Sequence, residues 1–518
     1  MAQAVETSAC ETAPRPQGPL PDHVRVAIVG AGFAGLGMAI RLAREGIDDF
    51  VVLERADDVG GTWRDNTYPG AACDVPSLLY SFSFAPKPDW SRSFSPQPEI
   101  LDYLRRCAVD HGITDRIRLG HEVVAARWHE DDRRWRVETA GGAVTADVLV
   151  GGMGPLSEPR IPDLPGIDTF RGAIFHSACW DHDHDLTGER VAVIGTGASA
   201  IQFVPQIQPQ VARLHLFQRT APWIVPRRDR DLTAAERWAY RRVPPLQRAV
   251  RGAIYWAREL FVLAFTGHRR VSQGAAMMAR DHLRRQVPDP GLRAKLTPDY
   301  TIGCKRILIS NDYYPALGQP NVEVVAEGVT EVRPHSVVAG DGTEREVDTI
   351  ICGTGFHVTD FPAGDRIFRD DGRSLTDVWS GGGMEAYLGA AVTGFPNLFL
   401  LIGPNTGLGH NSMVFMIESQ LSYVLGCLRY MDRTGVGTVD VRPDVQARYN
   451  EHVQGELEGT VWSSGGCRSW YIDERGRNTT LWPGFSWRFR LRTRRFDPAA
   501  YVTRGRRPAP VADGAGVV

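Results

Sequence analysis

The sequence predicts an α/β chain in which two parallel-sheet units are joined by a helical insertion. A buried strand, a tight glycine turn and an amphipathic helix follow one another in VRVAIVGAGFAGLGMAIRLAREGI, from Val24. The same order returns in ERVAVIGTGASAIQFVPQI, from Glu189. From Arg227 to about Pro298 the pattern turns helical and rich in arginine, with no glycine loop. These observations are typical of two Rossmann-like dinucleotide-binding domains with a helical insertion.

The glycines of the first repeat follow the spacing Gly30-x-Gly32-x-x-Gly35. The first glycine allows a tight turn, the second lets a pyrophosphate approach the backbone, and the third lets the helix pack closely against the strand. The next strand, FVVLER, carries Glu54 near its end. A carboxylate at that place accepts hydrogen bonds from ribose hydroxyls, so this repeat predicts a dinucleotide site that selects an unmodified ribose.

The second repeat has alanine at the helix-packing position of its turn. We expect the whole turn to contact a nucleotide, namely Gly195, Thr196, Gly197, Ala198, Ser199 and Ala200. The following strand, RLHLFQRT, ends without an acid and offers Arg219 and Thr220 instead. A cation at that place suits a ribose with a 2′-phosphate, so this site should prefer NADPH over NADH.

Two further strand-to-glycine segments, residues 146–160 and 347–361, mark crossings between the units. Beyond Phe395 the sequence predicts a strand, a glycine loop and a long helix that return to the first domain. The predicted organisation begins with a disordered arm, residues 1–21. The first dinucleotide domain comprises residues 22–157 and 390–518, and the second comprises residues 158–226 and 320–389. The helical insertion comprises residues 227–319.

Composition excludes several classes of function. The 518 residues are 43% hydrophobic and 23% charged with a net charge of −2, which suits a globular protein and gives no sign of nucleic-acid binding. The eight cysteines include no CxxC pair, which argues against a disulfide framework, a zinc ribbon or a dithiol redox centre and favours a reducing cytoplasm. We expect Cys304 and Cys352 to be buried, small and apolar. Oligomeric state leaves no signal in the sequence.

No segment is predicted to cross a membrane. Residues 1–21 lack the apolar core of a targeting signal. The most apolar helical window, AIYWARELFVLAFTG at 253–267, is shorter than the roughly 20 residues that a bilayer requires and carries Arg258 and Glu259. We expect a buried or cleft-lining helix there, with contact to a membrane surface as the alternative.

A site for an unmodified ribose together with a site for a 2′-phosphate implies FAD and NADPH. From about residue 22 to 503 the chain then resembles the class B flavin monooxygenases, specifically the type I Baeyer-Villiger monooxygenases. Their fingerprint F-x-G-x-x-x-H-x-x-x-W, followed by Pro or Asp, is matched by Phe170, Gly172, His176, Trp180 and Asp181. Their motif G-G-x-W-x-x-x-x-Y-P-G-x-x-x-D is matched by GGTWRDNTYPGAACD, from Gly60 to Asp74.

The resemblance implies roles for individual residues. Arg306, in YTIGCKRILISNDYY, matches the active-site arginine, and Lys305 matches a position that contacts the 2′-phosphate. A guanidinium cannot lose its proton, so it can stabilise a peroxide formed at the flavin C4a carbon. Asp74 is expected near Arg306, and the expected flavin contacts are Thr62, Trp63 and Tyr80. The alternatives are an interdomain salt bridge for Arg306, an incidental surface position for Lys305, a turn cap for Asp74 and core packing for Trp63.

The stretch FHSACWDHDHD, from Phe175 to Asp185, has the composition of a metal site. In the resembling family, its His and Trp organise contacts between the domains. A structural zinc site also prefers two separated pairs of ligands, whereas His182 and His184 alternate with aspartates. We therefore expect an interdomain linker followed by a solvated turn and no metal, with His182 and His184 dispensable.

Two further features keep open interpretations. His410, in GPNTGLGHNS, has no local partner and is expected to be a loop residue near the flavin. The aromatic tail CRSWYIDERGRNTTLWPGFSWRF predicts a hairpin at DERGRN whose aromatic residues either pack in the core or wall the substrate cavity.

The predicted function is a monooxygenase that uses NADPH and O₂ to insert oxygen beside a ketone carbonyl. An N- or S-oxygenating flavin monooxygenase is the nearest alternative. A disulfide reductase would need a cysteine pair, and Cys73 has no near partner. A non-catalytic nucleotide-binding protein is disfavoured by the two complete glycine loops. The sequence does not identify the ketone.

Overall fold

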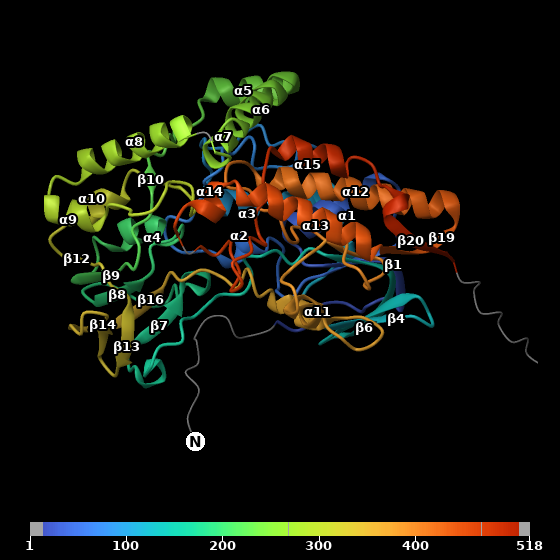
Figure 1. The fold of residues 1–518 in the computed structure, drawn as a ribbon, viewed down its shortest axis with the longest axis horizontal. Coiled ribbons are helices and arrows are strands. Elements are labelled where there is room, and N and C mark those ends of the chain that lie inside the picture. Colours follow the sequence, from blue (N-terminus) through green and yellow to red (C-terminus); the bar gives the residue numbers. More distant parts are fainter. Residues whose placement is uncertain (1–13, 268, 468, 507–518) are drawn as a thin grey trace, which may run out of the picture.

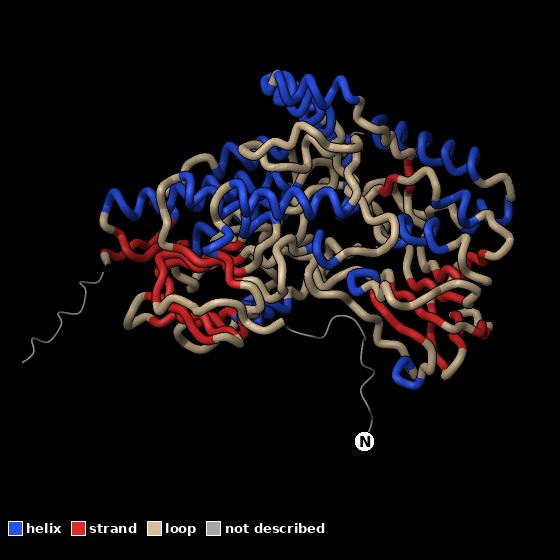
Figure 2. Tube along the Cα trace, turned by 180° about the vertical axis from the view of Figure 1, so that it is seen from behind, coloured by secondary structure: helices blue, strands red, loops and turns tan. Residues whose placement is uncertain are grey.

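Two separate β-sheets form the two lobes of the protein, with helices above both of them (Figure 1). The computed structural model describes residues 14–267, 269–467 and 469–506. The predicted α/β fold is confirmed, since each glycine repeat begins on a central strand of its own sheet. The rear view shows the two groups of strands separated by loops (Figure 2).

The larger sheet has the strand order β17-β4-β5-β6-β1-β2-β3, and β18 also pairs with β6. β1 pairs in parallel with β2 and β6, so the carboxyl ends of these strands meet at one edge of the sheet. The strands are β1 His23–Val29, β2 Phe50–Leu53, β3 Ile117–Arg118, β4 Val123–His129, β5 Arg134–Thr139, β6 Gly142–Gly151, β17 Ile367–Phe368 and β18 Leu398–Leu400.

A layer of helices lies on one side of this sheet in Figure 1. The longest of them, α12, ends at Thr434 and is followed by Gly435, whose positive φ of 70° makes a left-handed cap. These helices are α1 Phe33–Arg44, α3 Gln97–Asp110, α12 Met413–Thr434, α13 Pro443–Glu458 and α15 Ser486–Thr493. Smaller elements complete the first lobe: α2 Thr62–Asp65, α11 Leu375–Ser380, α14 Val461–Ser464, and the ribbon of β19 Val436–Val441 and β20 Tyr501–Gly505.

The smaller sheet has the order β12-β9-β8-β16-β7, and all its strands are parallel. Its central strands are buried along most of their length and consist largely of apolar residues, as is typical of a parallel sheet. The elements are β7 Ala173–His176, β8 Arg190–Ile194, α4 Ala200–Ile207, β9 Arg213–Phe217, β12 Val322–Val325 and β16 Thr349–Cys352, with the antiparallel strands β13 Val329–Arg333, β14 Ser336–Ala339 and β15 Glu344–Glu346 beside them.

The helical insertion leaves and re-enters the second lobe at one place. β10, Ile224–Val225, pairs in parallel with β11, Leu308–Ile309, so this short pair holds the two ends together. Between them, α5 and α6 project from the body at the top of Figure 1. The helices are α5 Ala234–Arg242, α6 Pro244–Glu259, α7 Val262–Phe265, α8 Arg269–Gln286, α9 Pro290–Lys295 and, after β11, α10 Tyr313–Leu317.

Two details differ from the predicted organisation. β17 lies within the segment 320–389 that we assigned to the second domain, but it pairs with β4 of the first sheet. The described part of the predicted disordered arm, residues 14–21, contacts the first lobe, where the Gln17 N–H donates to Leu119 O at 2.9 Å. The expectation of disorder is therefore wrong for residues 14–21; residues 1–13 lie outside the described residues.

Both glycine turns have glycine where the backbone is tightly turned or closely packed, as their spacing predicts. Gly30 and Gly195 adopt φ values of 94° and 108°, which disfavour other residues. A Cβ atom on Gly35 would lie 1.8 Å from Gly30 O, so α1 can approach β1 only because this position has no side chain.

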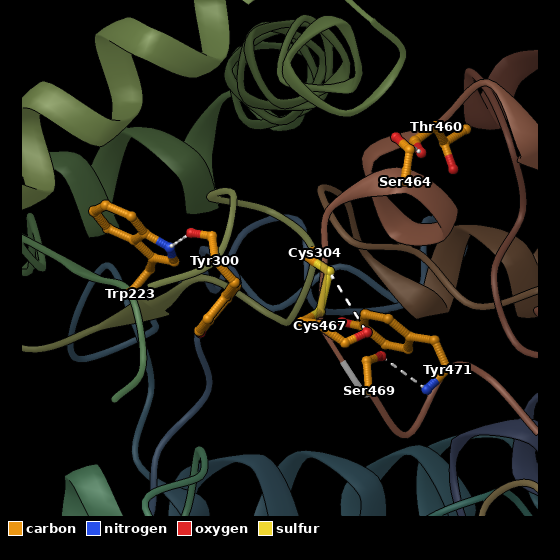
Figure 3. Close-up of a disulfide and its surroundings, with 8 residues drawn as sticks. All are labelled: Trp223, Tyr300, Cys304, Thr460, Ser464, Cys467, Ser469 and Tyr471. Carbon is orange, nitrogen blue, oxygen red and sulfur yellow. Dashed lines mark hydrogen bonds between the residues drawn. A yellow bond between two sulfur atoms is a disulfide. The ribbon is translucent and has the colours of Figure 1, made fainter. Parts of the chain in front are cut away.

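A disulfide joins the insertion to the C-terminal tail. Cys304 is buried as expected, but the bond corrects the expectation that it serves only as a small apolar residue. Cys304 and Cys467 are separated by 163 residues in sequence and by 6.2 Å between their Cα atoms (Figure 3). Only the fold brings them together, so their spacing in the sequence gives no sign of the bond. Free buried thiols remain at Cys73, Cys107, Cys352 and Cys427.

We expect Cys304→Ser and Cys467→Ser each to lower the free energy of unfolding by about 2–4 kcal/mol, because the bond restricts the unfolded chain. Chemical denaturation measures this loss. The double variant should lose no more than either single variant, because both remove the same bond. Additive losses would show that the cysteines act separately.

Candidate functional site

A cavity of about 290 Å³ opens at the carboxyl ends of β1, β2 and β6. It lies where parallel strands end, which is the usual ligand site of an open α/β sheet. Most of the residues predicted to contact the flavin line it: Gly30, Gly32, Glu54, Thr62, Trp63, Tyr80 and Arg306. Gly35 lies behind the turn, against Gly30, and therefore has a packing role.

The glycine turn at this cavity suits an anionic group. α1 begins after Gly32, which has no side-chain cap, and its first turn carries no acid. Its first N–H groups are therefore free to bind a pyrophosphate at the positive end of the helix dipole. The buried Glu54 carboxylate is held by the Ala31 N–H at 2.7 Å and by Arg64 Nη1 at 3.0 Å. The sequence reasoning missed Arg64, since nothing in the motif marks it.

Arg306 and Asp74 form an ion pair at the edge of the cavity. Arg306 donates to Asp74 Oδ2 through Nε at 2.9 Å and through Nη2 at 2.5 Å, although the residues are 232 positions apart. Burial alone would raise the pKa of the Asp74 carboxyl, but the guanidinium outweighs it and lowers the pKa below its usual value. Asp74 in turn raises the pKa of Arg306. Each group therefore favours the charged form of the other.

The ion pair leaves one nitrogen of the Arg306 guanidinium, Nη1, unused. Nη1 makes no hydrogen bond with any residue that the structure describes, and Arg306 lines the cavity. Beside it, Trp63 donates from Nε1 to the Tyr80 hydroxyl at 3.0 Å, with the two rings edge to face. Trp63 thus lines the cavity and also packs against the core, which supports the core interpretation, while its contact with the flavin stays a prediction.

The second glycine turn begins at the end of β8 and leads into α4. Thr196 Oγ1 donates to Thr220 O at 3.4 Å, which places the turn against the end of the next strand. Lys305 lies near Arg219: burial, followed by the field of this guanidinium, lowers the pKa of the Lys305 ammonium. Two cations brought together in this way form a suitable site for a phosphate.

The fingerprint segment crosses the second lobe. A Cβ atom on Gly172 would lie 1.9 Å from Asp348 O, so glycine is required there, and Phe170 packs in the core beside it. His176 ends β7 and is buried against the Phe356 ring. Burial lowers the pKa of His176 to about 4, so its imidazole is neutral near pH 7.

Trp180 belongs to a chain of contacts that joins the two lobes. Its ring packs against Phe203 of α4, and Phe203 packs against Tyr68 of the YPG segment, with ring centroids 5.3 and 6.1 Å apart. Gln202 of α4 accepts from the Tyr68 hydroxyl at 3.0 Å and donates to Ala72 O at 3.0 Å. α4 therefore holds the segment that ends at Asp74, a contact that sequence reasoning did not find.

The Asp-His turn is more engaged than the sequence indicated. Asp181 Oδ1 accepts from the Asp183 N–H, and His182, although exposed, lies 2.8 Å from Thr67 Oγ1 of the first lobe. His184 lies 2.9 Å from Thr349 Oγ1 and is only partly exposed. The expectation of a merely solvated turn is therefore wrong for His184. Within the described ranges, no group of three or more possible ligands is placed to hold a metal ion.

The end of α6 reaches towards the same ion pair. Arg258 Nε donates to His410 O at 3.0 Å, and the field of Asp74 partly offsets the lowering of the Arg258 pKa by burial. The neighbouring carboxylate of Glu259 is 1% exposed and binds His410 Nε2, Asn411 and Ser486. His410 thus has a partner 151 residues away, which explains why no local pattern revealed it.

Some aromatic residues of the tail pack in the core and one lines the cavity, so both roles that the sequence left open occur. Tyr471 and Trp482 are 1% exposed and belong to the main core, whereas Trp470 is 44% exposed and lines the cavity. A bridge between Ile472 and Asn478 closes the predicted turn. The Cys304–Cys467 bond, drawn in Figure 3, therefore anchors the tail to the segment that leads into Arg306. The cavity-lining Trp470 follows three residues after Cys467.

Comparison with known proteins identifies the family. Residues 23–242 match the family model described as flavin-binding monooxygenase-like. A Baeyer-Villiger monooxygenase of Streptomyces coelicolor is 55% identical over 495 residues, which is 95% of each chain. A Baeyer-Villiger monooxygenase of Pseudomonas aeruginosa is 54% identical over 482 residues, covering 92% of this chain and 91% of the relative.

Solved structures agree with this relationship. A steroid monooxygenase bound to NADP superposes with a TM-score of 0.81 at 32% identity, covering 91% of this chain and 97% of the other. Cyclohexanone monooxygenase from Rhodococcus sp. Phi1, bound to NADP⁺, superposes with a TM-score of 0.83 at 28% identity, covering 94% of this chain and 100% of the other. None of the described helices combines the length and the apolarity that a bilayer span requires. With relatives of this identity along nearly its whole length, the chain belongs to the flavin-dependent Baeyer-Villiger monooxygenases.

Proposed function

We propose that the protein uses FAD, NADPH and O₂ to insert one oxygen atom beside the carbonyl of a ketone, giving an ester or lactone. The reaction balances as ketone, O₂, NADPH and H⁺ converted to ester, NADP⁺ and water. The observation that carries the proposal is the Arg306–Asp74 ion pair at the cavity, with Nη1 of Arg306 left as an unused donor.

Each side chain has a task that its geometry supports. The α1 turn would bind the pyrophosphate of FAD, and Glu54 would bind its ribose. The flavin, when bound, supplies the two-electron chemistry and the activation of O₂. Asp74 fixes Arg306 through Nε and Nη2, so Nη1 keeps one direction and can stabilise negative charge as it develops on the ketone oxygen.

On the nucleotide side, the turn from Gly195 to Ala200 would hold the NADPH pyrophosphate. Arg219 and Lys305 would hold the 2′-phosphate, and Thr220 would lie beside them. Their positions support this assignment because two cations near one another are costly unless an anion binds between them. Lys305 immediately precedes Arg306, so a shift of the bound nucleotide would be transmitted to the ion pair through the backbone.

Product analysis separates this proposal from N- or S-oxygenation. The purified yellow protein is supplied with NADPH and a panel of ketones, amines and sulfides, and the products are analysed by mass. A gain of sixteen daltons that appears as an ester supports the proposal. Hydroxylamine or sulfoxide as the only product would reassign the reaction.

We also propose that the protein acts in the cytoplasm. The buried free thiols, Cys73, Cys107, Cys352 and Cys427, fit a reducing compartment, whereas the Cys304–Cys467 bond gives this location no support.

Arg306→Ala should lower ester formation at least about 100-fold, because one oriented donor to a developing oxyanion is removed. Flavin content, measured by absorbance, should stay near that of the wild type. Arg285→Ala, which removes an exposed arginine of α8, serves as the matched control and should leave the rate unchanged. Ester formation by Arg306→Ala at the normal rate would contradict the mechanism.

Trp180→Ala and Gln202→Ala should each slow flavin reduction by NADPH about tenfold, because both weaken the contact that positions the segment from Tyr68 to Asp74. Stopped-flow absorbance measures this step. The double variant should lose less than the product of the single effects, since both changes act on α4. His182→Ala, which removes one exposed hydrogen bond, is the control and should change the rate less than twofold.

A further inference from the structure

The outer side of α6 is apolar although it faces away from the body of the protein. Leu246, Ala249, Ala253, Trp256 and Leu260 recur at intervals of three and four residues and continue just past the end of the helix, which places them on one side of it. All five are exposed, with Trp256 and Leu260 at 58% and 61%. We call these five residues the outer face; they belong to the part of the insertion that projects in Figure 1.

α6 packs on the first lobe through the side of the helix that is opposite to the outer face. Gln247 donates to Lys87 O at 2.7 Å, Arg251 donates to Leu78 O at 2.6 Å, and Glu259 binds the loop at His410. Ile254 and Tyr255 pack against the main core between these contacts. The helix therefore carries a complete inner face and a second apolar face that the fold leaves uncovered.

Further apolar side chains enlarge this region. Trp238 of α5 is 63% exposed, Val243 between α5 and α6 is 46% exposed, and Phe261 after α6 is 53% exposed. Single exposed apolar residues are common on protein surfaces, but exposed tryptophan, leucine and phenylalanine gathered on one helical hairpin indicate an interaction site.

The exposed charges of α5 and α6 that lack a salt bridge to the described residues are positive. Arg242 and Arg248 are exposed and form no salt bridge with any residue that the structure describes. The only acids of the two helices are already engaged, Glu236 with Arg230 and Glu259 in the buried cluster. The hairpin thus presents tryptophan and leucine together with uncompensated arginines.

We propose that the α5–α6 hairpin docks on an anionic lipid surface. An amphipathic helix with arginine beside an apolar face that includes tryptophan has the features of helices that lie in a membrane interface. A second copy of the chain fits less well, because two such hairpins would bring unpaired arginines together with no exposed acid of α5 or α6 to neutralise them.

Docking would place the lipid surface beside the reaction site. The outer face ends at Leu260, next to Arg258 and Glu259, and Arg258 is near enough to Asp74 for their charges to interact. An apolar substrate dissolved in the lipid would therefore meet the protein near its cavity. The docking itself does not depend on the proposed reaction, because vesicle binding is measured without turnover.

The test is cosedimentation of the purified flavoprotein with vesicles of phosphatidylcholine, with and without phosphatidylglycerol. We expect binding to the anionic vesicles at low ionic strength, at least about tenfold weaker binding to phosphatidylcholine alone, and weakening with added salt. Absence of any preference for the anionic vesicles overturns the proposal.

Variants locate the surface. Trp256→Ser/Leu246→Ser and, separately, Arg242→Gln/Arg248→Gln should each weaken vesicle binding about tenfold or more, with flavin content unchanged. The matched controls change exposed residues elsewhere, Val109→Ser/Val124→Ser and Arg494→Gln/Arg495→Gln, and should bind like the wild type.

Two results contradict the assignment. One is an equal loss of binding in the control variants, which would show that vesicle binding does not use this hairpin. The other is a dimer in sedimentation velocity that Trp256→Ser/Leu246→Ser dissociates, which would assign the face to a second copy.

Discussion

The position of the Arg306 guanidinium is the constraint on which the rest of the site depends. An ion pair at the edge of a cavity adds little net stability, because removing two charges from water offsets most of their attraction. Its contribution is geometric: both hydrogen bonds of Asp74 go to one edge of the guanidinium and leave Nη1 in a fixed direction. The surrounding structure must therefore hold two backbone segments 232 residues apart in fixed relative positions.

Each partner of this pair is anchored independently. Asp74 lies at the end of the segment that Gln202 and Phe203 hold from the second lobe. Arg306 lies between the Cys304–Cys467 bond and the β10–β11 pair, so the tail and the base of the insertion both limit its movement. On the proposed function, a nucleotide bound at the second glycine turn would be connected to the ion pair along two routes, through α4 and through Lys305. Binding of the nucleotide would then affect the orientation of the arginine without any contact between nucleotide and Asp74.

The sequence was informative wherever function rests on local backbone geometry. Gly30 and Gly195 adopt positive φ values, and Gly35 lies too close to the backbone of Gly30 to carry a side chain. These requirements restrict the positions to glycine, and the resulting spacing is visible in the sequence. The pairing of Arg306 with Asp74 was expected only from resemblance. Contacts between distant segments left no signal at all: Glu259 with His410, Gln202 with Tyr68, and Cys304 with Cys467. The contact of His184 with Thr349, 165 residues away, left no signal either, although its second partner, Glu189 at 3.1 Å, is only five residues along the chain.

The helix that ends at Glu259 shows why a pattern of apolar residues alone cannot decide what an element does. Its apolar residues form two stripes on opposite sides of the helix. In the linear sequence, these residues lie next to one another and look like one hydrophobic segment. The structure separates them: Ile254 and Tyr255 pack inward with Arg258 and Glu259, while Trp256 points outward. A buried carboxylate with several donors fixes the inner side, so the helix cannot rotate to hide the outer one. The outer face is therefore exposed as a consequence of the site's own construction, and only a partner outside this fold can cover it.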